Sequence, residues 1–455
     1  MKDLVDREEE FELVEGLIRD NSFRFFSVMG RRRVGKTELM KSFLEDTQGF
    51  YFYVPLGDSL QIRLRYAEKL SDRLDVSFVG RPSWRVIFEE MFEASTEEQF
   101  LVVFDEFQRF LKVDDSVPLI LQEMIDKYKD DSKMALGVVG SSIGMMNSMF
   151  DSSAPLYGRR TDQIWLDPLK FQYASEFIEG SLKDKVQYYS VFGGTPKYLE
   201  FIENDKSLEG NIEDNILSDN SILYDEPEAL LSTELDSPEE YLEILRLISQ
   251  GKQTPKQITD NIEIEKTSFS YYAKNLIERL GLLEKEVPAT EKPGKSRNTH
   301  YKIKDNFFNF YFRFVYPQRD QLELDNQEGV KKKIMSELNS YTGRVFEDIV
   351  LDWIRTKNGD KGLETYERIG RWWNRQGQEL DICGTKKDGA LLGEIKFSEV
   401  GHSTAEKLDQ KIKNTEHFDN INQKVIVGVE ITAEAKEYLE NEEILYFELE
   451  DISQK

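Results

Sequence analysis

The chain has 455 residues, enough for roughly three domains, and its 60 basic and 86 acidic residues give a formal net charge of −26. A surface this acidic repels nucleic acid and anionic membranes as a whole, so contact with nucleic acid requires a local basic patch. The single cysteine, Cys383, excludes an internal disulfide, and three histidines leave no zinc cluster. No apolar run reaches membrane-spanning length and the first residues do not resemble a signal peptide, so we expect a cytoplasmic protein without membrane contact.

A phosphate-binding loop is predicted near the start of the chain. The aromatic run Phe23–Met29 predicts a buried strand and residues 38–44 predict a helix, with GRRRVGKT at 30–37 between them. In such a loop backbone N–H groups approach phosphate oxygens, the Lys36 ammonium reaches the outer phosphates, and the Thr37 hydroxyl can ligate magnesium. The alternative is a chance match in a turn. The predicted nucleotide-binding residues here are Gly30, Arg33, Val34, Gly35, Lys36, Thr37 and Glu38.

Later strands end in polar side chains. Three further apolar runs predict buried strands at 50–54, 100–104 and 134–139. A carboxylate at the tip of a strand beside a phosphate loop can hold the magnesium shell, so we assign Asp105 to the metal and Glu106 to the attacking water. Ser141, after the next strand, could sense the terminal phosphate and is counted with the nucleotide-binding residues, although such a strand end is often only a turn.

An arginine pair precedes the last strand predicted in this part, at 163–166. A guanidinium from Arg159 or Arg160 could neutralise the transferring phosphoryl group, an effect worth ~10³ or more in rate where it operates. The alternative is a solvated pair, and we take Arg159 as the catalytic candidate. Alternating strands and helices imply a parallel sheet covered on both faces, with the ligand at the carboxyl ends of the strands.

Four segments together resemble the archaeal-type ATPase family, in the AAA-related STAND branch of P-loop NTPases. They are the start VDRE at 5–8, the loop at 30–37, VVFDEFQ at 102–108 and FGGTPKYL at 192–199. The resemblance implies a core that binds and hydrolyses ATP with Mg2+ over residues 1–170, and a helical lid over 171–235. Family members usually carry glycine where Asp6 stands. The Gly-Gly-Thr-Pro turn at 193–196 could also be only a helix breaker.

Residues 236–316 predict a winged helix-turn-helix. Three helical patterns are followed by strand-like runs at 282–287 and 299–304, which flank a loop with Lys292, Lys295 and Arg297. The third helix can enter a major groove and the wing can contact phosphates. A purely structural module that packs on neighbouring domains is the alternative, and nearby glutamates would dilute any attraction for DNA.

The last part, 317–455, contains a helix at 338–353 and strands at 364–369, 379–382 and 391–396. Glu394 and Lys396 share one face of the third strand, and Asp381 can pair alongside them. Carboxylates with a lysine can hold magnesium and present an activated water to a phosphodiester, so Asp381 and Glu394 are the predicted metal ligands. Solvated charges are the alternative. Residues 371–375, between the first two strands, could stack on nucleic acid or form an ordinary half-buried turn.

The order of these residues resembles the PD-(D/E)XK nuclease superfamily, with Leu380 where proline is usual. By that resemblance the catalytic residues are Glu347, Asp381, Glu394 and Lys396, in a C-terminal α/β restriction-endonuclease-like domain. Such domains can also keep the fold without activity.

The fold class predicted for the whole chain is therefore α/β, a P-loop NTPase followed by a lid, a winged helix and this C-terminal domain. The predicted function is an ATPase coupled to a DNA-binding winged helix and a metal-dependent nuclease-like domain acting on DNA or RNA. The alternative is an ATP-switched signalling or assembly ATPase, possible as a nucleotide-dependent homo-oligomer, whose C-terminal domain is a non-catalytic partner-binding module.

Overall fold

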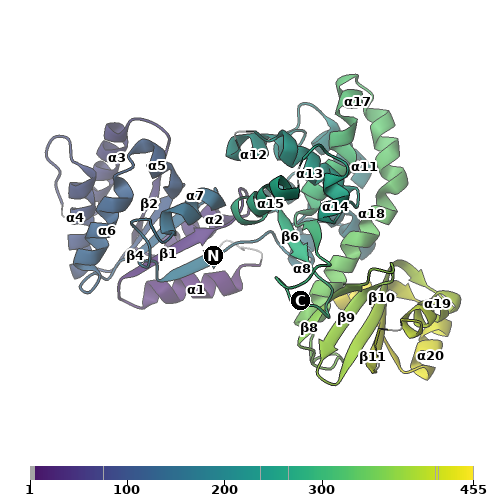
Figure 1. The fold of residues 1–455 in the computed structure, drawn as a ribbon. Coiled ribbons are helices and arrows are strands. Elements are labelled where there is room, and N and C mark those ends of the chain that lie inside the picture. Colours follow the sequence, from purple (N-terminus) through teal and green to yellow (C-terminus); the bar gives the residue numbers. More distant parts are fainter. Residues whose placement is uncertain are drawn as a thin grey trace. The chain divides into compact units, whose positions relative to one another are not determined.

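The computed structural model describes residues 6–453 except 75, 236, 265, 416 and 419. The chain divides into two compact units, the first with residues 1–168 and 274–281 and the second with 169–273 and 282–455. Figure 1 labels their helices and strands. Among the described residues, no helix combines the length and the apolar character that a membrane crossing requires.

The first unit is built on a five-stranded sheet in the order β2-β3-β4-β1-β5, in which every neighbouring pair is parallel. The P-loop NTPase fold class predicted from the alternating pattern is confirmed. The strands are β1 Arg24–Met29, β2 Gly49–Tyr53, β3 Leu101–Asp105, β4 Ala135–Gly140 and β5 Asp162–Trp165. The main helices are α1 Glu8–Arg19, α2 Lys36–Asp46, α3 Ser59–Ser71, α4 Trp84–Glu97, α6 Val117–Tyr128 and α7 Ile143–Phe150.

Two apolar cores cover the faces of this sheet. Side chains of α1 and α2 pack on one face, and an aromatic-rich set from α3, α4, α6 and α7 packs on the other. As a result β3 and β4 are buried at every position. Two short segments, η1 Phe107–Arg109 and α5 Phe110–Val113, follow β3 directly and continue the aromatic core.

The second unit begins with short helices. They are α8 Phe171–Ala174, η2 Ser175–Phe177, α9 Leu182–Phe192, α10 Pro196–Leu199, α11 Leu208–Ile212, the π-turn η3 Glu213–Leu217 and α12 Glu226–Glu234. The Gly-Gly-Thr-Pro segment ends α9 and places Pro196 at the first position of α10. Leu169 and Gly194 meet there, because the Leu169 N–H donates to the Gly194 carbonyl at 2.7 Å.

Three helices and an antiparallel hairpin follow in the order expected for a winged helix. They are α13 Glu239–Ser249, α14 Pro255–Thr259, α15 Lys266–Lys274 with the π-turn η4 Asn275–Arg279, β6 Leu283–Glu286 and β7 His300–Ile303. The last residues of the third helix group with the first unit. Connecting helices are α16 Asn306–Phe310, η5 Tyr311–Val315, η6 Tyr316–Gln318 and α17 Arg319–Glu323.

The C-terminal part is a separate mixed sheet in the order β12-β11-β10-β9-β8. β8, β9 and β10 are antiparallel neighbours, whereas β10, β11 and β12 run parallel. Helix α18 packs on one face through Phe346 and Trp353, and α19 and α20 cover the other (Figure 1). The elements are α18 Gln327–Thr356, β8 Arg368–Trp373, β9 Glu379–Lys386, β10 Gly389–Val400, α19 His402–Lys413, β11 Ile421–Ile431, α20 Ala433–Asn441, β12 Ile444–Glu448 and α21 Leu449–Ser453.

Two predicted boundaries in this part are wrong. The long helix begins at Gln327 rather than near 338, because the Asn326 side chain caps it by accepting the Gly329 N–H at 3.2 Å. The strand predicted at 364–369 instead covers 368–373, so Arg371 and Trp372 belong to strand β8 and not to an aromatic turn.

The junction of Leu169 and Gly194 gives a stability prediction. A Cβ added to Gly194 would lie 1.9 Å from the Leu169 carbonyl oxygen, so Gly194→Ala should lower the free energy of unfolding of the second unit by about 3 kcal/mol. Gly210→Ala in α11 is the control, because its added Cβ meets atoms no closer than 3.6 Å. Urea midpoints measure both, and a midpoint for Gly194→Ala equal to that of Gly210→Ala would contradict the prediction.

Candidate functional site

The loop between β1 and α2 is shaped by two glycines. Gly30 has φ 154° and a Cβ there would lie 2.3 Å from the Leu166 carbonyl oxygen, while Gly35 has φ 96°. Both positions therefore require a residue without a side chain. The other predicted loop contacts differ in exposure: Val34 is buried in the core, Arg33 is partly exposed at φ 72°, and Glu38 is exposed in the first turn of α2.

Arg7 fastens this loop from the N-terminal segment. Its buried guanidinium donates to the carbonyl oxygens of Val34, at 3.3 Å, and Asp167, at 2.8 Å. The preceding Asp6 has φ 52°, in the left-handed region that glycine adopts without strain. The VDRE pattern at 5–8 includes Arg7 but does not by itself predict this contact.

Lys36 is the first residue of α2, and its side chain reaches back into the loop. Its ammonium donates to the carbonyl oxygens of Gly30, at 2.8 Å, and Arg31, at 2.6 Å. Burial lowers its pKa to about 8, and the carboxylates of Glu106 and Asp105 oppose that shift. The positive charge is thus bonded to backbone oxygens, at the position where phosphate oxygens would be bound.

Thr37 and Asp105 meet at the carboxyl edge of the sheet. The Thr37 hydroxyl donates to Asp105 Oδ2 at 2.8 Å, the Tyr51 hydroxyl donates to the same oxygen, and the Glu106 N–H donates to Oδ1 at 2.8 Å. A hydroxyl beside a carboxylate is a donor set that suits Mg2+, so these residues fit the ion, which Thr37 and Asp105 would hold. No sequence pattern predicted the contact of Tyr51 with Asp105, although Tyr51 lies on β2, whose Tyr53 pairs in register with Asp105.

Glu106 follows with a left-handed backbone, at φ 58°. Its carboxylate accepts from Ser141 Oγ at 3.0 Å and from Gln108 Nε2 at 2.8 Å, and it forms an ion pair with Arg109 Nε at 3.4 Å. Ser141, considered above as a phosphate sensor, therefore contacts the predicted water-orienting residue. Gln108 is the last residue of the VVFDEFQ segment and Arg109 follows it, but the pattern predicted no role for either side chain.

The two arginines before β5 have partners away from the loop. Arg159 forms a bidentate pair with Asp126, at 2.9 and 2.6 Å. Arg160 is half-buried, donates to Ser27 Oγ at 3.1 Å and lies over the Phe150 ring at 4.5 Å. The view of a solvated pair is therefore wrong for Arg160, and contact of either guanidinium with phosphate stays a prediction.

The C-terminal sheet brings the predicted residues near one another. Burial raises the pKa values of Glu347, on α18, and Glu394, on β10, and the nearby charge of Asp381 raises both further. The positive charge of Lys396 opposes the rise of the Glu394 pKa. Asp381 Oδ2 accepts the Ile395 N–H at 2.9 Å. Lys396 is exposed, because β10 passes from its buried to its exposed section at that residue. We call Glu347, Asp381 and Glu394 the carboxylate cluster.

Two basic side chains form ion pairs with carboxylates of this cluster. Lys411 on α19 contacts both oxygens of the fully buried Glu394, at 2.7 and 2.8 Å, and Arg371 on β8 binds Glu347 at 3.1 Å. No group of three or more His, Cys, Asp or Glu in the described ranges is arranged to hold a metal ion. In this arrangement Lys411 and Arg371 pair with the carboxylates that a divalent metal would need, and the prediction of a metal at Asp381 and Glu394 gains no support.

The wing is docked on this sheet. The Ala289 N–H donates to the Arg371 carbonyl at 2.9 Å, and the rings of His300 and Trp373 stack at 4.2 Å with an interplanar angle of 7°. Trp372 is buried and contacts Phe418. The proposed stacking of these tryptophans on nucleic acid is therefore wrong for Trp372, whose ring belongs to the core.

Charged side chains are also prominent elsewhere in the second unit. Arg371 also binds Glu286 of the wing at 3.1 Å and Asp348 at 2.8 Å, so one guanidinium joins β6, α18 and β8.

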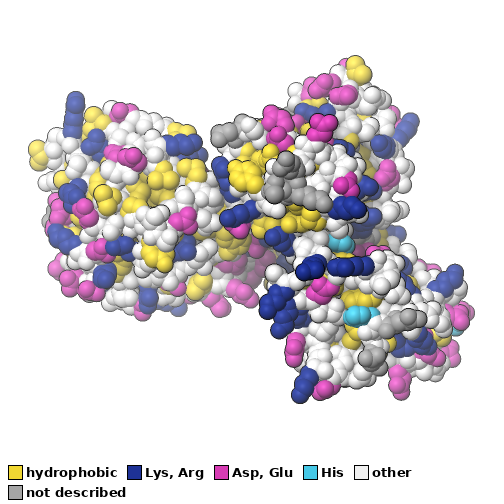
Figure 2. Space-filling model, in the orientation of Figure 1, with side chains coloured by type: hydrophobic (Ala, Val, Ile, Leu, Met, Phe, Trp, Pro, Cys, Tyr) yellow, Lys and Arg dark blue, Asp and Glu magenta, His cyan; other side chains and the backbone are white. Residues whose placement is uncertain are grey.

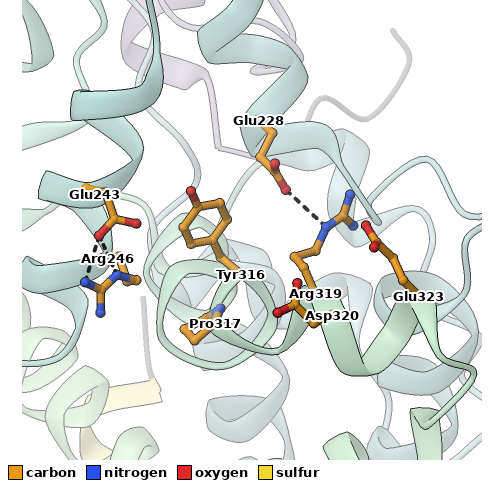
Figure 3. A pocket seen from close by; sticks show the side chains of 8 residues that line it. All are labelled: Glu228, Glu243, Arg246, Tyr316, Pro317, Arg319, Asp320 and Glu323. Carbon is orange, nitrogen blue, oxygen red and sulfur yellow. Dashed lines mark hydrogen bonds and ion pairs between the residues drawn. The ribbon is translucent and has the colours of Figure 1, made fainter.

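A separate hollow of about 540 Å3 lies among α12, α13, η6 and α17 (Figure 3). In it Arg319 pairs with Glu228 at 3.4 Å and Arg246 with Glu243 at 2.7 Å. This hollow contains none of the predicted site residues.

Comparison with known proteins identifies the class of the chain as an archaeal-type P-loop ATPase. A family described as an ATPase domain predominantly from Archaea matches residues 4–202, and a family of archaeal and bacterial proteins of unknown function matches residues 311–408. An uncharacterized protein of Methanocaldococcus jannaschii is 31% identical over 460 residues, which cover 99% of this chain and 100% of that protein. The chain therefore belongs to this archaeal ATPase family.

One solved structure supports the fold, and a second is similar at a lower TM-score. The Walker-type ATPase of Pyrococcus abyssi is 20% identical, covers 68% of this chain and 96% of its own, and superposes with a TM-score of 0.51. The ORC2 protein of Aeropyrum pernix, in complexes with ADPNP and ADP, is 16% identical over 73% of this chain and 96% of its own, with a TM-score of 0.46. At these identities the first likeness speaks for the fold alone.

The buried Glu394 predicts a pH-dependent stability. Its pKa is raised from 4.5 to about 7, so the fold favours the protonated form and loses this stabilisation as pH rises from about 4.5 through 7. Glu394→Gln stays neutral, so with EDTA present its loss of unfolding free energy from pH 5 to pH 8 should be smaller than the parent's by about 1–3 kcal/mol. Denaturant unfolding measures this, with the exposed Glu399→Gln as control. An unchanged pH dependence would show that folding does not raise the pKa of Glu394.

Proposed function

We propose that this protein binds ATP with Mg2+ in the first unit and hydrolyses it. The observation that carries the proposal is the contact of Thr37 with Asp105 at the carboxyl edge of a parallel sheet, directly beside the buried Lys36. Membership of the archaeal ATPase family supports the same function.

Each residue then has a defined role. The loop N–H groups and Lys36 bind the phosphates, and Thr37 and Asp105 would hold the magnesium ion, which would neutralise charge on the phosphoryl group being transferred. Glu106 orients the attacking water and accepts its proton. Ser141 contacts Glu106 and supports its orientation. Arg159 or Arg160 would contribute only after leaving its present partners.

Two substitutions separate binding from turnover. Lys36→Ala should weaken Mg·ATP binding by about 100-fold, because a buried charge-assisted contact is lost. Glu106→Gln should keep the binding and lower kcat by about 100-fold. Calorimetry and phosphate release measure the two quantities, with the exposed Lys129→Ala as control. Normal turnover in Glu106→Gln would mean that another residue orients the water.

A second candidate function, action on nucleic acid, is favoured by the wing loop. Lys292, Lys295 and Arg297 are exposed there, and Arg375 of the C-terminal part donates to Asn298 at 3.1 Å. Figure 2 shows Lys and Arg side chains gathered between the helices of the second unit and its mixed sheet. These side chains form a local basic surface in a chain of net charge −26, and such a surface would attract the phosphates of DNA or RNA.

Cleavage of that nucleic acid would require the carboxylate cluster. Its support is the meeting of Glu347, Asp381 and Glu394, and the order and topology of the elements that carry them. The pairing of Glu394 with Lys411 favours the other candidate, a non-catalytic module that binds a partner. The exposed Lys396 could orient a water only if a substrate covered it.

A cleavage assay distinguishes the two. If the site is active, the parent with Mg2+ or Mn2+ and ATP cleaves single- or double-stranded DNA or RNA, and Asp381→Ala lowers the rate by about 100-fold or more, since a carboxylate of the centre is removed. Asp388→Ala, in an exposed turn, is the control. Cleavage that is absent in the parent, or equal in parent and Asp381→Ala, would reject the nuclease proposal and leave the partner-binding module.

A size measurement addresses assembly in the same preparation. The switched alternative expects the mass or shape of the protein to change between the nucleotide-free form and the form with a nonhydrolysable ATP analogue. Identical mass and shape in both states would count against nucleotide-dependent homo-oligomerisation.

A further inference from the structure

Glu106 makes most of its carboxylate contacts through Oε2, whereas within the described part of the chain its Oε1 accepts only from Ser141. Its carboxylate accepts hydrogen bonds from Gln108 at 2.8 Å and from Ser141 at 3.0 and 3.3 Å, and it forms an ion pair with Arg109 at 3.4 Å. A carboxylate that orients an attacking water must offer it a strongly accepting oxygen. Each cation held on the carboxylate reduces that accepting strength, so Arg109 competes with the water.

Arg109 is held in this position by other contacts. Its guanidinium donates to the Tyr53 hydroxyl at 2.6 Å and to the Val54 carbonyl at 3.3 Å, and it lies 5.2 Å from the centre of the Tyr53 ring. Its side chain is 29% exposed, so it can turn toward solvent without leaving a buried charge unpaired. An ion pair with these properties is one that can open.

Gln108 is neutral and buried, whereas Arg109 is charged and partly exposed. It is 3% exposed, its Nε2 donates to Glu106, and its Oε1 is buried with no hydrogen-bond partner among the described residues. The same oxygen lies against Gly140, the last residue of β4, where an added Cβ would be 2.7 Å away. A neutral donor that cannot leave fixes the direction of the carboxylate without neutralising it.

We propose that the Arg109 ion pair restrains Glu106 at rest, and that Gln108 is a positioning residue that fixes the Glu106 carboxylate for the attacking water. The inference rests on the proposed ATP hydrolysis and deepens it. Its consequence is that the resting rate is set below the rate the site can reach, and that release of Arg109 raises turnover while nucleotide affinity stays constant.

The first test measures kcat and the Mg·ATP dissociation constant for the full chain and for Arg109→Met, which keeps the apolar stem and removes the charge. We expect kcat to rise roughly two- to ten-fold, the factor that corresponds to loss of a partly exposed ion pair, with the dissociation constant unchanged. Arg109→Lys keeps a positive charge and should stay near the parent rate. Lys112→Met, one turn further along and exposed, is the matched control.

The second test uses Gln108→Leu, which keeps the volume and removes the donor. We expect kcat to fall roughly ten-fold with the dissociation constant unchanged, since only the orientation of Glu106 is lost. In the Glu106→Gln background neither substitution should change the rate further, because both act through the Glu106 carboxylate. A purely structural role would lower affinity and rate together and would persist in that background.

Each outcome decides the inference. A rate for Arg109→Met at or below the parent's overturns the restraint, and a parent-like rate for Gln108→Leu overturns the positioning role. If the parent hydrolyses ATP and both variants have the parent's kcat, the proposed ATPase function stands and only the roles inferred for Arg109 and Gln108 are rejected. An inactive parent with an active Arg109→Met supports the restraint, and inactivity in both rejects hydrolysis and inference alike.

Discussion

Both faces of the first sheet are covered by apolar cores, and this covering confines the polar side chains of its central strands β3 and β4 to the carboxyl edge. β3 and β4 are buried at every position, so Asp105 and Ser141 can be polar only because each stands where its strand ends. The parallel arrangement brings these ends to one edge together with the loop after β1. The proposed nucleotide site therefore follows from the burial of the strands, and its residues need no separate scaffold.

The C-terminal part contains carboxylates that burial makes unfavourable in their charged form. Glu394 is fully buried and the Glu347 side chain is 27% exposed, and an ionised carboxylate taken out of water is unfavourable without a partner. Lys411 and Arg371 provide these partners, and Arg371 also binds Glu286 of the wing. The Arg371 guanidinium, which pairs with Glu347, thus also fastens the wing to the sheet, so the winged helix and the mixed sheet share one charged junction.

The sequence predicts the local parts of this structure well. The strand–loop–helix around Lys36, the strand before Asp105 and the hairpin of the wing depend on short-range patterns of apolar residues, glycines and turn residues. Partners supplied from distant elements escaped prediction. Tyr51, Arg371 and Lys411 reach their carboxylates across register and packing that no local pattern encodes. The β8 error has the same origin, because Trp372 is buried by Phe418 from beyond the next helix rather than by its own neighbours.

The two sites also differ in what a ligand would have to displace. Lys36 is bonded to backbone carbonyls and its pKa is depressed to about 8 by burial, so an incoming phosphate would replace neutral acceptors and relieve the penalty on its charge. A cation entering the carboxylate cluster would instead have to break the contact of Glu394 with Lys411 and that of Glu347 with Arg371. Binding of an anion at the first site is therefore favoured by its resting electrostatics, whereas the second must first give up pairs that stabilise the fold.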